Sequence, residues 1–402
     1  MIRPTCRRAL IPIALICVIA GCGSGFPPPE LPPFSPIPEP DPSSVEAVLF
    51  LVGDAGQAET GRSPLLANLR GDVERWSKAL GRDSAVAVAF LGDNVYPRGL
   101  RDRSDRHFPT DSTRLWSQID VVAGPAARAH ATVGWFLPGN HDWGGMVGRK
   151  GIARLRNQAE ALERARAGGE ARVALLPEAG RPGPAIRDVG DGYRIVILDT
   201  DWFLRPLDET EATAFFDELQ RILESAGERE IIVLAHHPWE TSGPHGVTEG
   251  GRALGYYWLL EKSGTLVQDL DSPVYSDFIG EFRKRVAAAD RRPLLFAGGH
   301  DHSLQVFRGD GPTDPEHVLV SGAGSKLTRV SAAEGLRFAA SRPGYMTLVF
   351  RTSGELDLYV TAGDPELQPC RGDESARAAC MQRGIAAFET VYSAVLRPGQ
   401  VP

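Results

Sequence analysis

Two histidines stand close together just after a predicted strand and could bind a metal ion. His300 and His302 follow the hydrophobic run 293–297 and two glycines, Gly298 and Gly299. In an extended segment, side chains two residues apart project from the same side, so both imidazoles can face one space. Neutral imidazole is a common ligand for zinc, iron, copper and nickel. A polar loop with two solvated histidines would show the same pattern, so further ligands must come from elsewhere in the chain.

Other polar side chains follow other hydrophobic runs along the chain. Each of these runs reads as a buried strand and ends in a turn that contains glycine or proline. With the two histidines, the full set of candidate ligands is Asp54, Asp93, Tyr96, Asn140, His236, His300 and His302. A single metal ion takes three or four protein ligands, so this set, with a carboxylate that can be shared, predicts two metal ions. Two-metal sites clamp the attacking and leaving oxygens in phosphoryl transfer.

The segments around these residues resemble the five motifs of the calcineurin-like metallophosphoesterases. In the family's order they are Gly53-Asp54-Ala55-Gly56, Gly92-Asp93-Asn94-Val95-Tyr96, Gly139-Asn140-His141-Asp142, Val233-Leu234-Ala235-His236 and Gly299-His300-Asp301-His302. More narrowly, the chain resembles the purple acid phosphatases of the small, animal and bacterial type. Most calcineurin-like enzymes have a ligating histidine at the position of Gly56, and purple acid phosphatases replace it with a tyrosine at the position of Tyr96. A packed aromatic side chain beside Pro97 is the alternative reading of Tyr96.

The resemblance implies a ligand set for each metal ion, a fold and an activity. Fe(III) would be held by Asp54, Asp93, Tyr96 and His302, and a divalent ion, iron, zinc or manganese, by Asp93, Asn140, His236 and His300. Free tyrosine has a pKa of about 10, so binding as phenolate requires a strongly acidic metal. The implied fold is a four-layer α/β/β/α sandwich of two mixed sheets. The implied activity is that of an acid phosphatase, in which a metal-bound hydroxide attacks phosphomonoesters.

Two more histidines are candidates for contact with the substrate. His141 adjoins a predicted ligand, and Asp142 could orient it to protonate the leaving alkoxide. His245 lies nine residues after His236, an offset that resembles the small purple acid phosphatases, in which a histidine there contacts substrate. A solvated loop histidine is the alternative for His245. The neighbouring His237 is predicted to be structural and turned away from the ligand beside it.

Hydrophobic runs alternate with helical patterns, which predicts an α/β protein with its site along the strand ends. Strands are predicted at 48–52, 86–91, 133–137, 193–198, 231–235, 293–297, 318–321, 345–351 and 356–361, and helices at 60–80, 113–129, 150–166, 209–225, 275–289 and 374–381. We predict one catalytic domain, 46–363, because the candidate ligands span it without a linker between them. A C-terminal extension, 364–402, follows it.

The first 45 residues are predicted to be a processing segment and a tether. Three arginines precede an apolar run, 9–20, that is short for a membrane-spanning helix. The run ends in Ile-Ala-Gly-Cys, which resembles the lipobox of bacterial lipoproteins. Residues 1–21 would then be a signal peptide, and a lipid on Cys22 would attach the protein to a membrane. An ordinary secretory signal cleaved nearby, with an incidental cysteine, is the alternative. Residues 22–45 read as a proline-rich, extended tether.

The predicted location is therefore the bacterial cell envelope, outside the cytoplasm. Cysteine usage fits an oxidising compartment, in which Cys370 and Cys380 could form a disulfide. Two buried free thiols are the alternative on spacing alone.

The charge pattern excludes one class of partner. The formal net charge is −7, and no basic block or aromatic-basic stripe predicts nucleic-acid binding.

Two alternative functions are compatible with the sequence. A phosphodiesterase, or a nucleotide or phospholipid hydrolase, is the alternative within the same superfamily. A non-catalytic lipoprotein that acts as a binding module is the alternative of another class. The sequence leaves the oligomeric state open.

Overall fold

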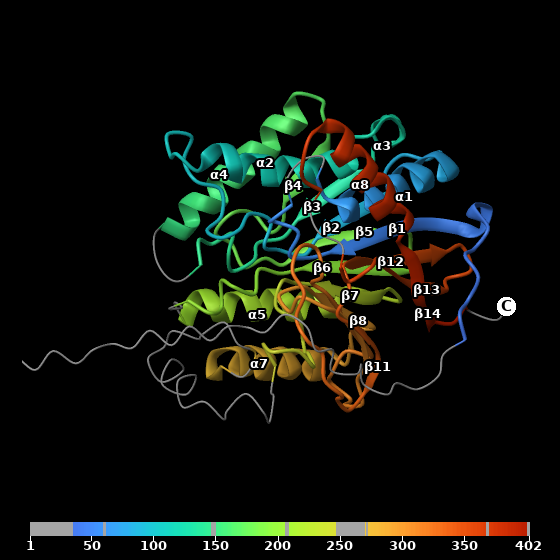
Figure 1. The fold of residues 1–402 in the computed structure, drawn as a ribbon. Coiled ribbons are helices and arrows are strands. Elements are labelled where there is room, and N and C mark those ends of the chain that lie inside the picture. The colour runs from blue at the N-terminus through green and yellow to red at the C-terminus, as the bar shows by residue number, and fades with distance from the viewer. Residues whose placement is uncertain are drawn as a thin grey trace, which may run out of the picture.

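The fold consists of two mixed β-sheets packed face to face, with helices on both outer faces (Figure 1). The computed structural model describes residues 35–58, 62–145, 150–205, 209–246, 270, 272–366 and 370–399. The predicted signal peptide and Cys22 lie outside these ranges. The four-layer α/β/β/α arrangement confirms the predicted fold class.

The first sheet places three of the predicted motifs at one edge. Its order is β14 (Glu389–Arg397), β13 (Leu356–Ala362), β12 (Gly344–Arg351), β1 (Val45–Val52), β2 (Val86–Phe90), β3 (Val133–Phe136) and β4 (Arg172–Leu175). Strands β1 to β4 are parallel, so their carboxyl ends lie side by side. Along β1, Phe50 and Val52 pack toward the outer helices, whereas Leu49 and Leu51 pack between the sheets. This alternation is the period of two expected of a strand buried on both faces.

The second sheet places the two histidine motifs opposite the first sheet. Its order is β11 (Leu336–Ala340), β9 (Leu304–Arg308), β10 (His317–Ser321), β8 (Leu295–Gly298), β7 (Glu230–Leu234), β6 (Tyr193–Ile197) and β5 (Ala185–Val189). Strands β6, β7, β8 and β10 are parallel. Strand β5, at one edge, and β9, beside β10, run antiparallel to them, and the other edge strand, β11, is antiparallel to β9. Apolar side chains of both sheets form one core between the layers.

Helices cover the two outer faces unequally. Next to the first sheet lie α1 (Pro64–Leu80), α2 (Phe108–Ile119), α3 (Pro125–Ala129), α4 (Lys150–Ala167) and α8 (Glu374–Ala386), and next to the second lie α5 (Glu209–Glu224) and α7 (Pro273–Ala289) (Figure 1). Helix α1 begins where the Ser63 hydroxyl accepts from the amide N–H of Leu66, and it ends at Gly81 in the left-handed conformation. Within the part of the chain described here, no helix is both long and apolar enough to cross a membrane.

The single helix predicted at 113–129 is wrong. The structure has α2, a 3-10 turn at Asp120–Val122 and then α3, which begins at Pro125. Proline has no amide N–H and clashes with the preceding turn, so a helix cannot continue through Pro125 but can start there.

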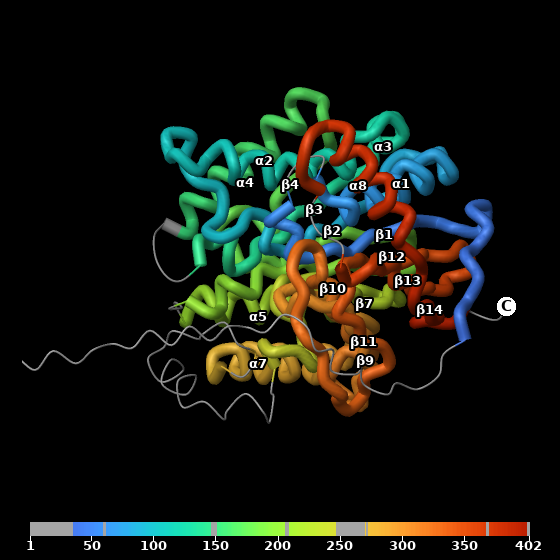
Figure 2. Tube along the Cα trace, viewed as in Figure 1, coloured from blue at the N-terminus to red at the C-terminus, as the bar shows by residue number. Residues whose placement is uncertain are grey.

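The predicted C-terminal extension contributes to the first sheet. Beyond the expected helix, the structure adds β14, which pairs with β13 along its length. The described segment that precedes β1 packs against this strand, because the amide N–H of Ile37 donates to Ser393 Oγ at 2.9 Å (Figure 2). A disulfide joins Cys370 and Cys380, with their Cα atoms 5.7 Å apart, which decides between the two readings of these cysteines.

Candidate metal centre

Loops from both sheets meet at one place. They follow β1, β2, β3, β7 and β8 and carry Asp54, Asp93, Asn140, His236 and His300, respectively. The backbone ties the two sheets together there, since the amide N–H of Gly53 donates to the carbonyl of Ser321 at 2.6 Å. The imidazole of His236 reaches across as well, with Nδ1 2.8 Å from the carbonyl oxygen of Leu91. Residues far apart in the sequence therefore form one buried cluster.

Three candidate ligands have a backbone conformation that is rare for residues with a Cβ. The φ angles of Asp54, Asp93 and His300 are 60°, 56° and 65°, in the left-handed region. Such conformations cost about 1–3 kcal/mol each and concentrate at functional sites, where the surroundings hold them in place. The shared strain supports a functional role for these three loops.

Two motif glycines allow the loops to approach this closely. A Cβ on Gly139 would lie 2.3 Å from the backbone nitrogen of Asp93 and 2.5 Å from its Oδ1. A Cβ on Gly92 would lie 2.5 Å from Nδ1 of His236, and the φ of Gly92 is 90°. Any larger residue would push a candidate ligand out of place.

Asp54, Tyr96 and His302 form the first group of donors. The Tyr96 hydroxyl donates to Asp54 Oδ1 at 2.8 Å and lies 3.2 Å from His302 Nε2. His302 Nε2 is also 3.5 Å from Asp54 Oδ1. Burial, followed by the carboxylates of Asp54 and Asp93, raises the pKa of Tyr96 well above its usual value. A phenolate therefore requires a cation at this position, as expected for a hard metal ion.

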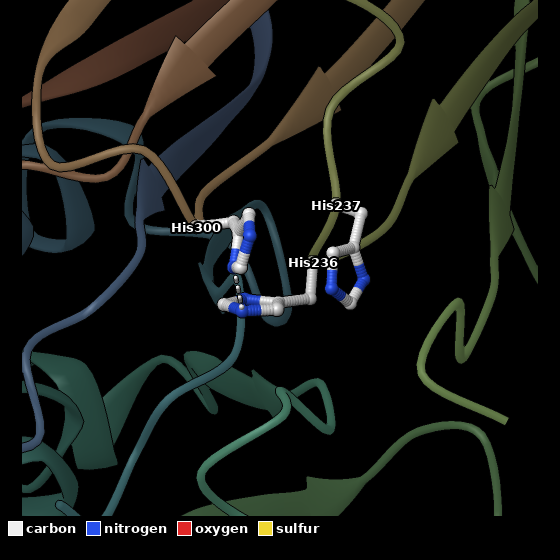
Figure 3. Close-up of side chains that lie close together, drawn as sticks. All are labelled: His236, His237 and His300. Atoms are coloured by element: carbon white, nitrogen blue, oxygen red, sulfur yellow. Dashed lines mark hydrogen bonds between the residues drawn. The ribbon is translucent and has the colours of Figure 1, made fainter. Parts of the chain in front are cut away.

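Asp93, Asn140, His236 and His300 form the second group. His236 Nδ1 must carry its proton, because the Leu91 carbonyl can only accept. When the imidazole is neutral, the lone pair on Nε2 faces Asn140 Oδ1 at 3.0 Å and Asp93 Oδ1 at 3.6 Å. His300 Nδ1 is 3.2 Å from the same nitrogen (Figure 3).

The charge balance of this group also fits a cation. Burial opposes a charge on His236, but the carboxylates of Asp93 and Asp54 outweigh it and raise its pKa. Burial holds the pKa of His300 well below its usual range, so its imidazole is neutral. The carboxylates thus favour a positive charge where the donor atoms of Asn140, His236 and His300 converge, as a metal ion would supply.

His237 lies closer to the cluster than predicted. Its ring centroid is 4.4 Å from that of His300 and 4.9 Å from that of His236, so it is not turned away (Figure 3). One ring nitrogen from each of His236, His237 and His300 lies within 4.8 Å of the other two, close enough to bind one ion. However, Nδ1 of His237 is 2.9 Å from the hydroxyl of Thr200, which fixes its ring. Its Nε2 is buried without a hydrogen-bond partner.

His141 is held by a different partner from the one predicted. Its Nδ1 lies 2.7 Å from the carbonyl oxygen of Pro97, and its Nε2 lies 3.8 Å from Asp93 Oδ2. Asp142 is fully buried and accepts instead from backbone amides of Gly139 and Asn94. A buried carboxylate needs several hydrogen-bond donors. Because its donors come from the loops after β2 and β3, Asp142 joins these two loops.

His245 lies beside two of the candidate ligands. Its ring centroid is 4.4 Å from that of His300 and 6.3 Å from that of His302. Asp301, to which the sequence motifs assign no role, is buried, and its carboxylate accepts from the Thr241 hydroxyl at 2.9 Å. The amide of His245 is 3.4 Å from the same carboxylate. Asp301 thus positions the loop that presents His245.

Lys326 was missed by the sequence analysis, because it belongs to none of the five motifs. Its Nζ lies 3.6 Å from the centroid of the Tyr96 ring. Burial lowers the pKa of Lys326, and the carboxylates of Asp93 and Asp54 oppose that shift. A cation over an aromatic face is attracted by the ring quadrupole. No local sequence pattern indicates this contact, which joins segments more than two hundred residues apart.

Comparisons with known proteins show the fold. Neither a protein-family model nor a curated protein matches the chain. Solved structures that match include GAP50, described as the anchor in the inner membrane complex of Plasmodium, with a TM-score of 0.54 and 15% identity over 89% of this chain and 90% of that chain. Purple acid phosphatase PPD1 from yellow lupin matches with a TM-score of 0.51 and 15% identity over 87% of this chain and 53% of that chain. PhoD matches with a TM-score of 0.52 and 12% identity over 88% of this chain and 70% of that chain.

Proposed function

We propose that the protein is a binuclear metal-dependent hydrolase of phosphoric esters that acts on phosphomonoesters. The observation that carries this proposal is the convergence of two donor groups, built from loops of both sheets, with Asp93 between them. The charge of Asp93 acts on both His236 and Tyr96. The likeness of the fold to a purple acid phosphatase and to PhoD supports the same conclusion.

The donor chemistry supports different ions for the two groups. We propose Fe(III) with Asp54, Asp93, Tyr96 and His302, and a divalent iron, zinc or manganese ion with Asp93, Asn140, His236 and His300. Two metal ions bound in this way supply an activated water and neutralise charge on the phosphoryl group in the transition state.

The protein's own residues orient the ester and deliver a proton. The Pro97 carbonyl fixes the ring of His141 through Nδ1 and leaves Nε2 on the side of Asp93. The side chain of His141 is 30% exposed, so an ester can reach it. The ring centroid of His245 lies 4.4 Å from that of His300. We propose that these two histidines contact the phosphoryl group and protonate the leaving oxygen.

An assay of purified protein loaded with iron and zinc tests this function. A chromogenic phosphomonoester should be hydrolysed faster than the matching diester, and metal analysis should find two ions per chain. A visible charge-transfer band should accompany iron, because tyrosinate would bind Fe(III). Faster hydrolysis of the diester would favour the phosphodiesterase alternative. An active, colourless protein with zinc or manganese would rule out the ferric site at Tyr96.

A second candidate function is that of a non-catalytic binding module. Its support is the structural similarity to GAP50, which is described as an anchor. A protein that retains no metal and hydrolyses neither ester after reconstitution would favour this alternative.

We further propose that a lipid on Cys22 tethers the protein to a membrane of the bacterial cell envelope. Cys22→Ala should release the protein into the soluble extracytoplasmic fraction, and labelled fatty acid should no longer be incorporated. Release of the unsubstituted protein into that fraction would instead indicate an ordinary secretory signal.

A further inference from the structure

A cavity of about 610 Å³ lies beside the candidate metal centre. Its walls come from the start of α1, from α2, from the loop after β10 and from the turn before α8. Figure 2 shows α8 beside α1 at this side of the molecule. The cavity adjoins the centre, because two of its lining residues contact candidate ligands. The Ser325 hydroxyl donates to the carbonyl of Asp54, and the ammonium of Lys326 covers the Tyr96 ring.

The charge of this cavity is unlike that of the whole protein. Four basic side chains line it, Arg62, Arg114, Lys326 and Arg371, and none of the described lining residues is acidic. The protein as a whole has a net charge of −7. An anion bound between these side chains would lower their mutual repulsion, and a low surrounding dielectric strengthens this effect.

A further feature favours an anion there. Ser63, Pro64 and Leu65 at the first turn of α1 also line the cavity, and a helix N-terminus carries a partial positive charge. Guanidinium groups match the geometry of phosphate through paired N–H donors.

We propose that this cavity binds a second phosphate group of the substrate, carried on the leaving alcohol. This inference rests on the proposed function, since it assigns the ester hydrolysed at the metal centre to the class of organic bisphosphates. The volume suffices for a phosphate together with part of a linking carbon chain. Leu65 and Phe388 provide the apolar contacts such a chain would need.

The inference is tested by measuring kcat/KM for alkanediol bisphosphates of increasing chain length. Each bisphosphate is compared with the alkyl phosphate of the same chain length. At the best length, kcat/KM should favour the bisphosphate by about tenfold or more. The double variant Lys326→Met/Arg371→Gln should reduce this ratio about tenfold or more. Arg128→Gln, an exposed charge on α3, should leave the ratio unchanged. A ratio near one at every length, or one that the double variant leaves unchanged, would overturn the inference while the proposed function stands.

A binding measurement separates failure of the inference from failure of the proposed function. If neither ester is hydrolysed, the proposed function fails, and calorimetry with inorganic pyrophosphate on the purified full-length protein still tests the cavity. Binding that weakens about tenfold in the double variant, and not in Arg128→Gln, would support the anion site. Absent binding, or binding that the double variant leaves unchanged, would overturn it.

Discussion

At the scale of single residues, hydrogen bonds to backbone groups orient the side chains of the candidate ligands. The Leu91 carbonyl fixes the tautomer of His236, and the amide of His300 donates to Asp54 Oδ2 at 2.7 Å. Each of these contacts directs a lone pair toward the centre of the cluster. Orientation of this kind raises metal affinity, because the ligands need little rearrangement when an ion binds.

Removing one ligand should remove a metal ion. His300→Ala is expected to lose at least one ion per chain and to lower phosphatase activity on the order of a thousandfold, because a metal ion contributes several kcal/mol to transition-state stabilisation. Elemental analysis beside kinetics measures both effects. His107→Ala, at an exposed loop position, is the control and should change neither. Full metal content in His300→Ala would place this residue outside the site.

Removing a residue that faces the substrate should have a different signature. His245→Ala is expected to keep both metal ions and to lower kcat about a hundredfold, because general acid catalysis contributes about that much. Esters with good leaving groups should be affected less than alkyl phosphates, since they need less protonation. Loss of metal in His245→Ala would show that this histidine is a ligand or supports one.

At the scale of elements, the site depends on how closely the loops after the strands can approach each other. The buried carboxylate of Asp142 joins two of these loops, and Asp301 anchors a third. The parallel strands set the loops side by side, but glycines decide their separation.

Gly139→Ala tests this dependence on close approach. The added Cβ would meet the backbone and carboxylate of Asp93, so we expect a loss of about 1–3 kcal/mol in the free energy of unfolding. Metal affinity should fall as well, because the loop that carries Asn140 would move. Denaturant titration and metal analysis measure the two effects.

The control for this substitution is Gly280→Ala in the middle of α7. Its Cβ would meet nothing within 4 Å, so the protein should become about 0.5–1 kcal/mol more stable and keep its metal. Equal effects of the two substitutions would contradict the role given to Gly139.

At the scale of the whole molecule, packing around the loop after β7 half-buries one carboxyl group, that of Glu240. Burial, with Asp314 and Asp310 nearby, raises the pKa of Glu240 to about 7, and Arg283 only partly opposes this shift. The folded state therefore holds a proton that the unfolded chain releases near pH 4.5. Between about pH 4.5 and 7 the free energy of unfolding should fall as the pH rises, because ionising Glu240 in the folded state is unfavourable.

Glu240→Gln should remove this pH-dependent loss of stability. At pH 8 the variant is expected to be about 1–2 kcal/mol more stable than the unsubstituted protein, after allowance for solvent screening, with a Tm higher by a few degrees. At pH 4.5 the difference should vanish, because the glutamate is then protonated in the folded state. Thermal unfolding at both pH values measures this, and an equal difference at both would disprove the assignment.

Apart from the four-layer arrangement, which the family resemblance implied, the sequence by itself was sufficient to predict an α/β protein, most helices and central strands, and the polar residues at the strand ends. These features follow from local patterns: runs buried on both faces, helical periodicity, and polar residues with glycine where a strand ends. The strands it missed, β4, β5, β9, β11 and β14, are mostly short or at sheet edges, where the alternation is weak. A helix across Pro125 was predicted because apolar periodicity outweighed the effect of one proline.

Only the tertiary structure decided the partner of His141, the placement of His237 against His300, and the roles of Asp301 and Lys326. The basic cavity likewise unites side chains from α1, α2, the loop after β10 and the turn before α8. Such contacts join residues distant in the chain, and nothing in the local sequence pattern records which side chains will face each other. Local patterns select the elements, whereas packing between the sheets and helices selects the neighbours.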